Sequence, residues 1–376
     1  MSIAVRRVTS LSELKTFVRF PVDLYRAEPH YVPTLFIDEL NTLRRDKNPA
    51  FEFCEADYFL AFIDNKIVGR IAVFVNQRSE EKWGKHWARF GWIDFIEDIE
   101  VAKELLSTAE EWARERACVA LHGPLGFTDM DREGMLVEGF DEVATLATIY
   151  NKKYYSEYLE QLGYKKDADW VEYRIVCPTE IPEKVRRVQD LIAKRSGVRI
   201  YPWRTKKELV ERFGKQIFNL LDEAYAKLYG TTPLSERQVQ SYIDQYLGFV
   251  DPRFTKIILD TEEKLIGFAI SMPSLSEALI RCRGRLFPFG WYHLLRALKN
   301  PKLIDLYLVA VKEEYQARGV VALLMGALIQ STVDAGVRLA ESNPELETNI
   351  EVQSLWKGYE RHQHKRRRVY LKELIK

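Results

Sequence analysis

The sequence has few cysteines, and their positions exclude several kinds of site. There are four, Cys54, Cys118, Cys177 and Cys282, and no two of them form a C-x-x-C pair. This spacing argues against a structural zinc site and against a redox dithiol. The six histidines lack the spacing of zinc ligands as well, so we expect no metal. Gly-x-Ser-x-Gly and Walker-type loops are absent, which leaves a serine hydrolase or a P-loop enzyme without support.

Long apolar runs and an excess of one charge are also missing. The longest apolar run, within residues 320–329, suits a buried helix and is too short to span a bilayer. The first residues lack the apolar stretch of a secretory signal, which predicts a cytoplasmic protein with reduced thiols. Lys and Arg number 56 against 55 Asp and Glu, a net charge of +1. Without a global positive field, we expect neither DNA nor a membrane as a partner.

The composition is that of a folded protein with more than one domain. Hydrophobic residues make up 47% of the chain and charged residues 30%, which excludes disorder as its main state. A length of 376 residues suggests two to three domains. Pro178 and Pro182 interrupt any regular element between them, so we place a linker there. The prediction is a first domain over residues 1–180 and a second over residues 181–376.

Two stretches of the chain share one order of elements, which indicates an internal duplication. β-branched runs on either side of a short turn predict a hairpin in each stretch, and apolar residues at helical spacing predict a helix. The first stretch reads as a hairpin at 58–75, an apolar segment at 91–96, a helix at 99–116 and a strand at 119–121. The second reads as a hairpin at 256–270, a strand at 303–311, a helix at 319–334 and a strand at 337–340. An additional aromatic and basic segment, 275–301, predicts a loop and a short helix over a site.

The most informative stretch is a strand, a short loop and an apolar helix at residues 308–324. The loop reads Gln316-Ala317-Arg318-Gly319-Val320-Val321. A helix that begins after a glycine-containing loop presents unpaired backbone N–H groups and the positive end of its dipole, which together suit a pyrophosphate. Arg318 can add a charge-assisted contact.

At these residues the chain resembles the GNAT superfamily of acyl-CoA-dependent N-acetyltransferases. Their Gln/Arg-x-x-Gly-x-Gly/Ala loop grips the CoA pyrophosphate; residues 316–319 match its first four positions, and Val321 replaces the small sixth residue. The resemblance implies an α/β (α+β) fold of two tandem GNAT-like domains, each a mixed, mostly antiparallel sheet flanked by helices. It also implies acetyl-CoA or another acyl-CoA as substrate. The residues implied to hold it are Val309, Val311, Gln316, Ala317, Arg318, Gly319, Val320 and Val321.

A second element of the family is an Asn followed seven residues later by a Tyr that serves as general acid. The first half has it as Asn151 and Tyr158. In the second half Asn349 is followed by Trp356, which cannot donate a proton in that role, and Tyr359 is a nearby substitute. The first half carries acidic residues at 97–100 where the cofactor loop would be, and these would repel a pyrophosphate. We therefore expect only the second half to bind acyl-CoA.

The resemblance further implies direct attack of an amine on the thioester, with a carboxylate or water taking the proton. Candidate bases are Asp305 on the strand at 303–311, and Glu341 and Glu347 after the next strand. For each of them a solvated or salt-bridged carboxylate is the alternative interpretation. The expected acceptor is a small-molecule amine or a peptide, the expected acyl group is acetyl, and the expected state is a monomer or homodimer.

Two alternatives remain beside the N-acyltransferase. Tandem GNAT-like domains also resemble the aminoacyl-tRNA-dependent peptidoglycan ligases, in which case the basic segments 281–285 and 365–368 would face tRNA. The net charge of +1 and the lack of a coiled-coil arm argue against a tRNA partner. Otherwise the basic residues at 365–368 would be solvated, or would contact the 3′-phosphate of CoA. The third hypothesis, motivated by Val321 and Trp356, is a non-catalytic protein that binds acyl-CoA or another small molecule.

Overall fold

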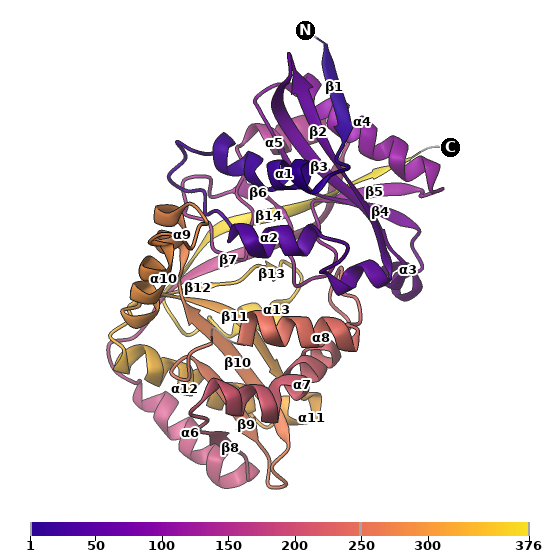
Figure 1. The fold of residues 1–376 in the computed structure, drawn as a ribbon. Helices are drawn as coiled ribbons and strands as arrows, with labels where there is room; N and C mark the ends of the chain where they lie inside the picture. The colour runs from indigo at the N-terminus through magenta and orange to yellow at the C-terminus, as the bar shows by residue number, and fades with distance from the viewer. Residues whose placement is uncertain (1, 248–249, 375–376) are drawn as a thin grey trace.

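The computed structural model describes residues 2–247 and 250–374, and Figure 1 shows their arrangement. The elements of the first half are β1 (Ile3–Arg7), α1 (Leu11–Leu24), α2 (Phe36–Leu43), η1 (Pro49–Glu52), β2 (Cys54–Ile63), β3 (Lys66–Asn76), α3 (Gln77–Trp83), β4 (Trp87–Phe95), α4 (Ile99–Glu115), β5 (Ala120–Gly123), β6 (Met135–Glu138), α5 (Tyr154–Gln161) and β7 (Lys165–Val176). Those of the second half are α6 (Glu183–Ser196), β8 (Arg199–Tyr201), α7 (Lys206–Tyr225), α8 (Glu236–Tyr242), η2 (Ile243–Leu247), β9 (Thr255–Leu259), β10 (Leu265–Pro273), α9 (Ser276–Cys282), α10 (Gly290–Lys299), β11 (Leu303–Val311), α11 (Glu313–Gln316), α12 (Val320–Asp334), β12 (Leu339–Ser342), β13 (Glu345–Leu346), α13 (Ile350–Ser354) and β14 (Arg361–Glu373).

All of these strands belong to one sheet. From each outer edge towards the centre, the strands of the two halves follow one another in the same order as along the chain. The order is β1-β2-β3-β4-β5-β14-β7-β12-β11-β10-β9-β8, with β6 paired to β14 and β13 paired to β7. Each half has one parallel pair, β4 with β5 and β11 with β12, and its other strand pairs are antiparallel. The expected mixed, mostly antiparallel sheet flanked by helices, present in two copies, is confirmed.

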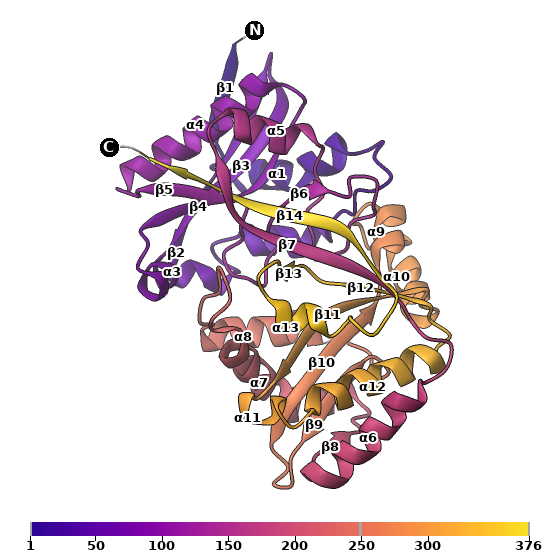
Figure 2. The ribbon, with the colours of Figure 1, turned by 180° about the vertical axis from the view of Figure 1, so that it is seen from behind.

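The two halves share their central strands. β14, the last strand of the chain, lies between β5 and β7 and pairs with both. β7 in turn pairs with β12 of the second half. Figure 2 shows β7 and β14 running side by side across the junction between the halves. Residues 361–373 therefore complete the sheet of the first half although they come last in the sequence.

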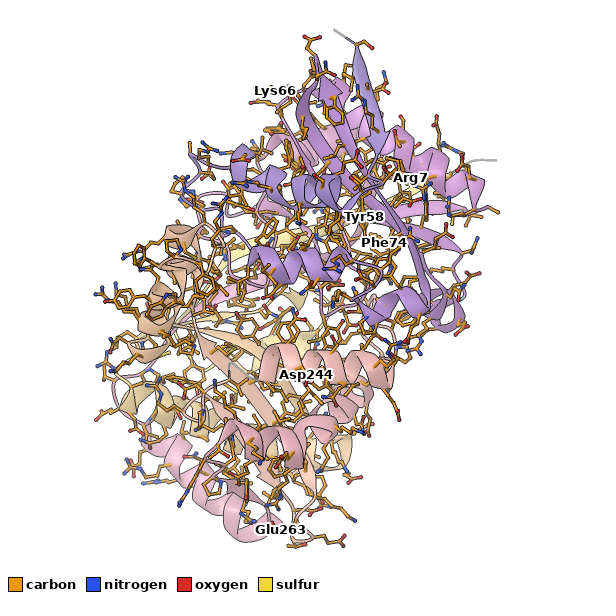
Figure 3. The ribbon with its side chains drawn as sticks, in the orientation of Figure 1. Arg7, Tyr58, Lys66, Phe74, Asp244 and Glu263 are labelled. Atoms are coloured by element: carbon orange, nitrogen blue, oxygen red, sulfur yellow. The ribbon has the colours of Figure 1, made fainter. Side chains whose placement is uncertain are left out.

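The helices follow the apolar patterns of their sequences. In α4 the buried side chains lie at helical spacing, from Val101 through Leu105 to Trp112, and pack on the sheet of the first half. Helix α12 is apolar on most of its surface because the sheet covers one side and α6 the other; a Cβ on Gly326 would lie only 2.5 Å from Gln189 of α6. Figure 3 shows the tips of the two equivalent hairpins, at Lys66 and Glu263, at opposite ends of the molecule.

The additional segment 275–301 forms two helices, α9 and α10, where we expected a loop and a single short helix. These helices pack against the first half at the lateral edge of the molecule (Figure 1). Ser276 Oγ donates to the carbonyl of Ala144 at 3.0 Å, and the amide of Phe36 donates to the carbonyl of Gly284 at 3.0 Å. Within the described residues, no helix is both long and apolar enough to cross a membrane.

Candidate functional site

The loop expected to hold a pyrophosphate leads into α12 through a glycine in the left-handed region. Gly319 has φ +77° and is the N-cap residue of α12. Gln316 closes the loop, since its Nε2 donates to the carbonyl of Val311 at 2.9 Å. Ala317 and Arg318 are exposed, and no side chain of the described residues caps the helix. The amides of Ala322 and Leu323 already donate to the carbonyl of Gly319, so the amides of Val320 and Val321, with the positive dipole end, are what the start of α12 offers to an anion.

The equivalent helix of the first half begins differently. Asp98 is the N-cap residue of α4, and its carboxylate accepts a hydrogen bond from the amide of Glu100 at 3.0 Å. A side-chain anion thus already occupies the place where a bound anion would lie. This is the physical reason behind the prediction that the first half does not bind acyl-CoA.

Strand β11 separates from its parallel neighbour before it reaches the loop. The two strands pair only from Leu303 to Leu306 on β11, with Leu339 to Ser342 on β12. Tyr307 is an extra residue in the register between β10 and β11, and therefore forms a bulge. Beyond it, the carbonyl of Val309 accepts a hydrogen bond from the Tyr225 hydroxyl at 3.3 Å. A ligand that paired with β11 as a strand would take over this bond.

Two of the candidate bases lie side by side. Asp305 and Glu341 are register partners on β11 and β12, and both are buried. Asp305 Oδ2 accepts a hydrogen bond from the Tyr307 hydroxyl at 3.4 Å, while Oδ1 has no partner among the described residues. Burial, followed by the negative charge of Glu341, raises the pKa of Asp305 to about 8. A carboxyl group of this kind exchanges a proton near neutral pH.

Glu341 belongs instead to a buried ion-pair network between β7, β12 and β14. It pairs with Lys365, whose ammonium group also lies 3.2 Å from Glu172. Glu172 pairs in turn with Arg367. Oxygen atoms of Glu172 and Glu341 and a ring nitrogen of His364 lie within 4.8 Å of one another, a grouping that could hold a cation. Lys365 and Arg367 already supply the positive charge that these carboxylates need.

From the sequence we expected the basic cluster at 365–368 to be solvated or to contact a phosphate. Both expectations are wrong, because its cations are held in ion pairs within the sheet. Lys365 and Arg367 are buried inside β14. Arg366 and Arg368 are mostly covered, and both pair with Asp169 of β7. Alternation along a strand places these four cations on both faces of the central sheet, where carboxylates meet them.

The remaining two candidate catalytic residues, Glu347 and Tyr359, make contacts with other residues. Glu347 is paired with Lys166 at 2.5 Å and with Arg366 at 2.9 Å, which is the salt-bridged alternative. Tyr359 is half-buried, packs with Trp356, and has its pKa raised by burial. Trp356 Nε1 donates to Glu345 at 2.7 Å. The structure thus brings Asp305 and Glu341 together, whereas the contacts of Glu347 and Tyr359 lie elsewhere.

A cavity in the first half was missed at the sequence level. Its volume is about 50 Å³, and its wall includes Arg70, Trp92, Asp94 and Tyr155. Arg70 and Asp94 form a buried ion pair at 2.8 Å, and Asp94 also accepts a hydrogen bond from the Tyr25 hydroxyl at 3.1 Å. Burial raises the pKa of Asp94 although Arg70 opposes the rise. The signal was available, since Asp94 is the one charged residue in the apolar segment 91–96.

The wall of this cavity is strained and aromatic. Trp92 has φ +45°, which is unusual for a bulky residue, and lies at the bulge of β4 that corresponds to the bulge of β11. Tyr31 and Tyr150 line the same space. So does Arg132, from the glycine-rich loop after β5, whose guanidinium donates to the carbonyl of Leu146.

Comparison with known proteins gives two curated relatives that match nearly the whole chain. One is Protein YghO of Escherichia coli (strain K12), 28% identical over 378 residues, which cover 98% of this chain and 95% of the relative. The other is Bacterial ceramide synthase of Caulobacter vibrioides (strain NA1000 / CB15N), 27% identical over 356 residues, which cover 93% and 91%. No protein-family model matches the chain.

Solved structures match over the full length of the chain. They include a tandem GNAT protein from the clavulanic acid biosynthesis pathway, with TM-score 0.56, 14% identity, and coverage of 100% of this chain and 99% of that one. A GCN5-related N-acetyltransferase from Sphaerobacter thermophilus has TM-score 0.52, 12% identity and coverage of 100% and 96%. At such identities the likeness concerns the fold, and it agrees with the duplicated sheet described above. The chain therefore has the tandem GNAT fold.

Proposed function

We propose that the protein is an acyl-CoA-dependent N-acyltransferase with its donor site in the second half. The GNAT fold supports acyl transfer in general. The observation that carries the donor site is the start of α12 at Gly319, which has no side-chain cap, follows the exposed residues Ala317 and Arg318, and lies beside a strand that has left its neighbour. Asp98 fills the equivalent position of the first half, which supports a single donor site.

In the proposed reaction the nitrogen of the amine attacks the thioester carbon. A C–N bond forms, the C–S bond breaks, and CoA leaves as a thiol. The amine must lose a proton on the way, and Asp305 is the proposed acceptor, because its pKa of about 8 lets it take and release a proton near neutral pH. Tyr359 stays the candidate donor of a proton to the departing thiolate.

We further propose that the acceptor is a long-chain amino alcohol. A ceramide is the amide of a fatty acid with such an amine, so the relative named a ceramide synthase bears the name of an N-acylation product. The cavity of the first half supports the polar head of this acceptor, since Asp94 offers a carboxylate for an ammonium or hydroxyl group beside Tyr31, Trp92 and Tyr150. A fatty acyl group is accordingly proposed in place of the acetyl group expected from the sequence.

The cavity and β11 are within electrostatic reach of each other. Burial raises the pKa of Tyr307, and the charge of Arg132, a cavity residue, opposes that rise. The charge of Arg132 therefore lies near enough to Tyr307 to affect it.

A charge placed at the start of α12 tests the donor site. Ala322 is exposed in the first turn of α12, so Ala322→Glu puts a carboxylate where the helix dipole favours it and where a pyrophosphate would be repelled. We expect an unchanged or higher melting temperature and at least about tenfold weaker binding of palmitoyl-CoA by calorimetry. Ala322→Gln is the matched control and should bind as the wild type does. Equal binding by both variants would move the donor site elsewhere, and a wild type that binds no acyl-CoA would sink the proposal.

The acceptor is tested by turnover. The wild type with palmitoyl-CoA should release thiol when sphinganine is added and yield the corresponding amide by mass spectrometry. Release with short amines alone would overturn the long-chain acceptor but keep the N-acyltransferase. The tRNA alternative is weakened because Lys365 and Arg367 are buried in ion pairs, and salt-sensitive binding of tRNA would revive it.

A further inference from the structure

The turn between α9 and α10, together with the outer side of α10, exposes a cluster of large apolar side chains. We call it the aromatic patch. Its members and their exposed fractions are Phe287 79%, Phe289 71%, Trp291 47%, Tyr292 52% and Leu295 57%. An apolar cluster of this kind on a surface marks an interaction site more often than an accident of packing. Figures 1 and 2 show α9 and α10 at the lateral edge of the molecule, in both views.

The aromatic patch is not needed to attach these helices to the protein. Leu275 and Leu279 are buried in the core of the first half, and Leu294 and Leu298 pack against it from α10. The inward side of α10 is thus satisfied by Leu294 and Leu298, while Trp291 and Leu295 point outward one turn apart. A helix that is apolar on both sides needs a second apolar surface to cover it.

Several donors at the start of α10 have partners within the segment. The amide of Trp291 donates to the carbonyl of Leu286 at 3.0 Å, and that of Tyr292 donates to Phe289 at 3.2 Å. The indole of Trp291 donates to the carbonyl of Pro288 at 3.0 Å. Donors that already have partners lower the cost of bringing this segment to the boundary of a bilayer.

Exposed cations surround the aromatic patch. Residues 275–301 contain five of them against the single acid Glu277, a formal charge of +4 in a chain whose total is +1. They are Arg281, Arg283, Arg285, Arg296 and Lys299. Only Arg281 has an ion-pair partner within the described part of the chain, at 4.0 Å from Glu277. The balance of the whole sequence hides this local field.

We propose that the aromatic patch and its cations dock the protein on the surface of an anionic lipid bilayer. Trp, Tyr and Phe side chains settle at the boundary between headgroups and acyl chains, and the arginines and Lys299 meet the anionic headgroups. A second copy of the chain fits this surface less well, because two-fold pairing of the patch would set the same five cations against one another. The docking goes beyond the proposed acyl transfer and does not depend on it.

The position of the patch has a consequence for substrate entry, which rests on the proposed function. The amide of Phe36 is bonded to Gly284 of the α9–α10 turn, and Tyr31 and Thr34 of the same segment line the cavity. Docking would bring that wall of the cavity towards the lipid from which a long-chain amine must come.

Flotation with vesicles tests the docking. The full-length protein is mixed with vesicles of phosphatidylcholine alone or with about one third phosphatidylglycerol. We expect flotation with the anionic vesicles, reduced by salt, and little with the neutral ones. Replacement of Phe287, Phe289 and Trp291 by Ser should lower the partition coefficient at least about tenfold. Each of Arg283→Gln, Arg285→Gln and Arg296→Gln should lower it about fivefold on anionic vesicles alone.

The matched control replaces three apolar side chains exposed elsewhere, Leu11, Val119 and Ile350, by Ser. This control should float as the wild type does. Absence of flotation by the wild type, or equal loss in patch and control variants, would overturn the proposal. So would a wild-type dimer in solution that the patch variant turns into a monomer without any vesicle binding. Calorimetry with acyl-CoA on the patch variant should match the wild type, so that failure of docking and failure of the proposed function are seen separately.

Discussion

Replacing Asp305 by Asn should make the protein more stable at neutral pH and remove its activity. The carboxyl group is buried on β11, and its Oδ1 has no partner among the described residues. Burial, with the charge of Glu341 second, raises its pKa to about 8. Asparagine has nearly the same shape as the protonated acid and never carries a charge, so it mimics the form that the folded protein prefers.

The magnitude follows from where the proton is held. Between the unfolded pKa of about 4 and the folded pKa of about 8, the folded chain keeps a proton that the unfolded chain has lost. In that window stability falls as the pH rises, by about 1.4 kcal/mol per pH unit. The advantage of Asp305→Asn should therefore grow from about zero at pH 4 to about 4 kcal/mol at pH 7, and level off above the folded pKa.

Urea unfolding of wild type and variant across this pH range measures the difference directly. In the same variant, thiol release from acyl-CoA should fall at least about 100-fold while acyl-CoA still binds. A stability difference that does not change with pH, or a variant that is less stable at every pH, would refute the reasoning about the buried proton. Full turnover by the variant would remove Asp305 as the base and leave the stability result standing.

Two further predictions concern the contacts that join the halves. Arg367→Met leaves Glu172 buried without its partner, and should lower the free energy of unfolding in urea by about 3–5 kcal/mol. The control Arg187→Met removes an exposed ion pair and should lower it by less than about 1 kcal/mol. Equal losses would contradict the role of burial. Gly284→Ala places a Cβ 2.0 Å from the carbonyl oxygen of Thr34 at φ +70°, and should lower stability by about 2 kcal/mol or more and speed amide exchange over residues 275–301. Unchanged exchange there would show that the turn adjusts without strain.

Much of the fold could be predicted because its patterns are local. The strand β11 and the helices α4 and α12 appear within one residue of where alternation and helical spacing placed them, and the hairpin of β2 and β3 begins four residues earlier than predicted, at Cys54. The duplication was visible for the same reason, since each copy repeats the same local order. In the loop 316–321, Gly319 lies within one residue of the predicted helix start, as the N-cap of α12, because a glycine before an apolar run is a local signal.

What could not be predicted depends on contacts between distant residues. The cluster at 365–368 has the composition of a solvated basic tail, and only the pairing of β14 with β7 brings Asp169 and Glu172 against it. The cavity beside Asp94 requires segments from α1 to α5 to meet, so the sequence analysis found only an apolar segment at 91–96.

The sequence by itself thus determined two copies of one α/β pattern, the positions of their main strands and helices, and a glycine-led helix start in the second copy. The tertiary structure decided that the copies share β7 and β14 and that most of the candidate carboxylates are in ion pairs. It also showed that a chain with a net charge of only +1 has a local surface that is cationic and aromatic. The physical reason is range: periodicity records how each segment meets its own side of the core, whereas pKa, burial and surface charge depend on which distant segments come to lie beside it.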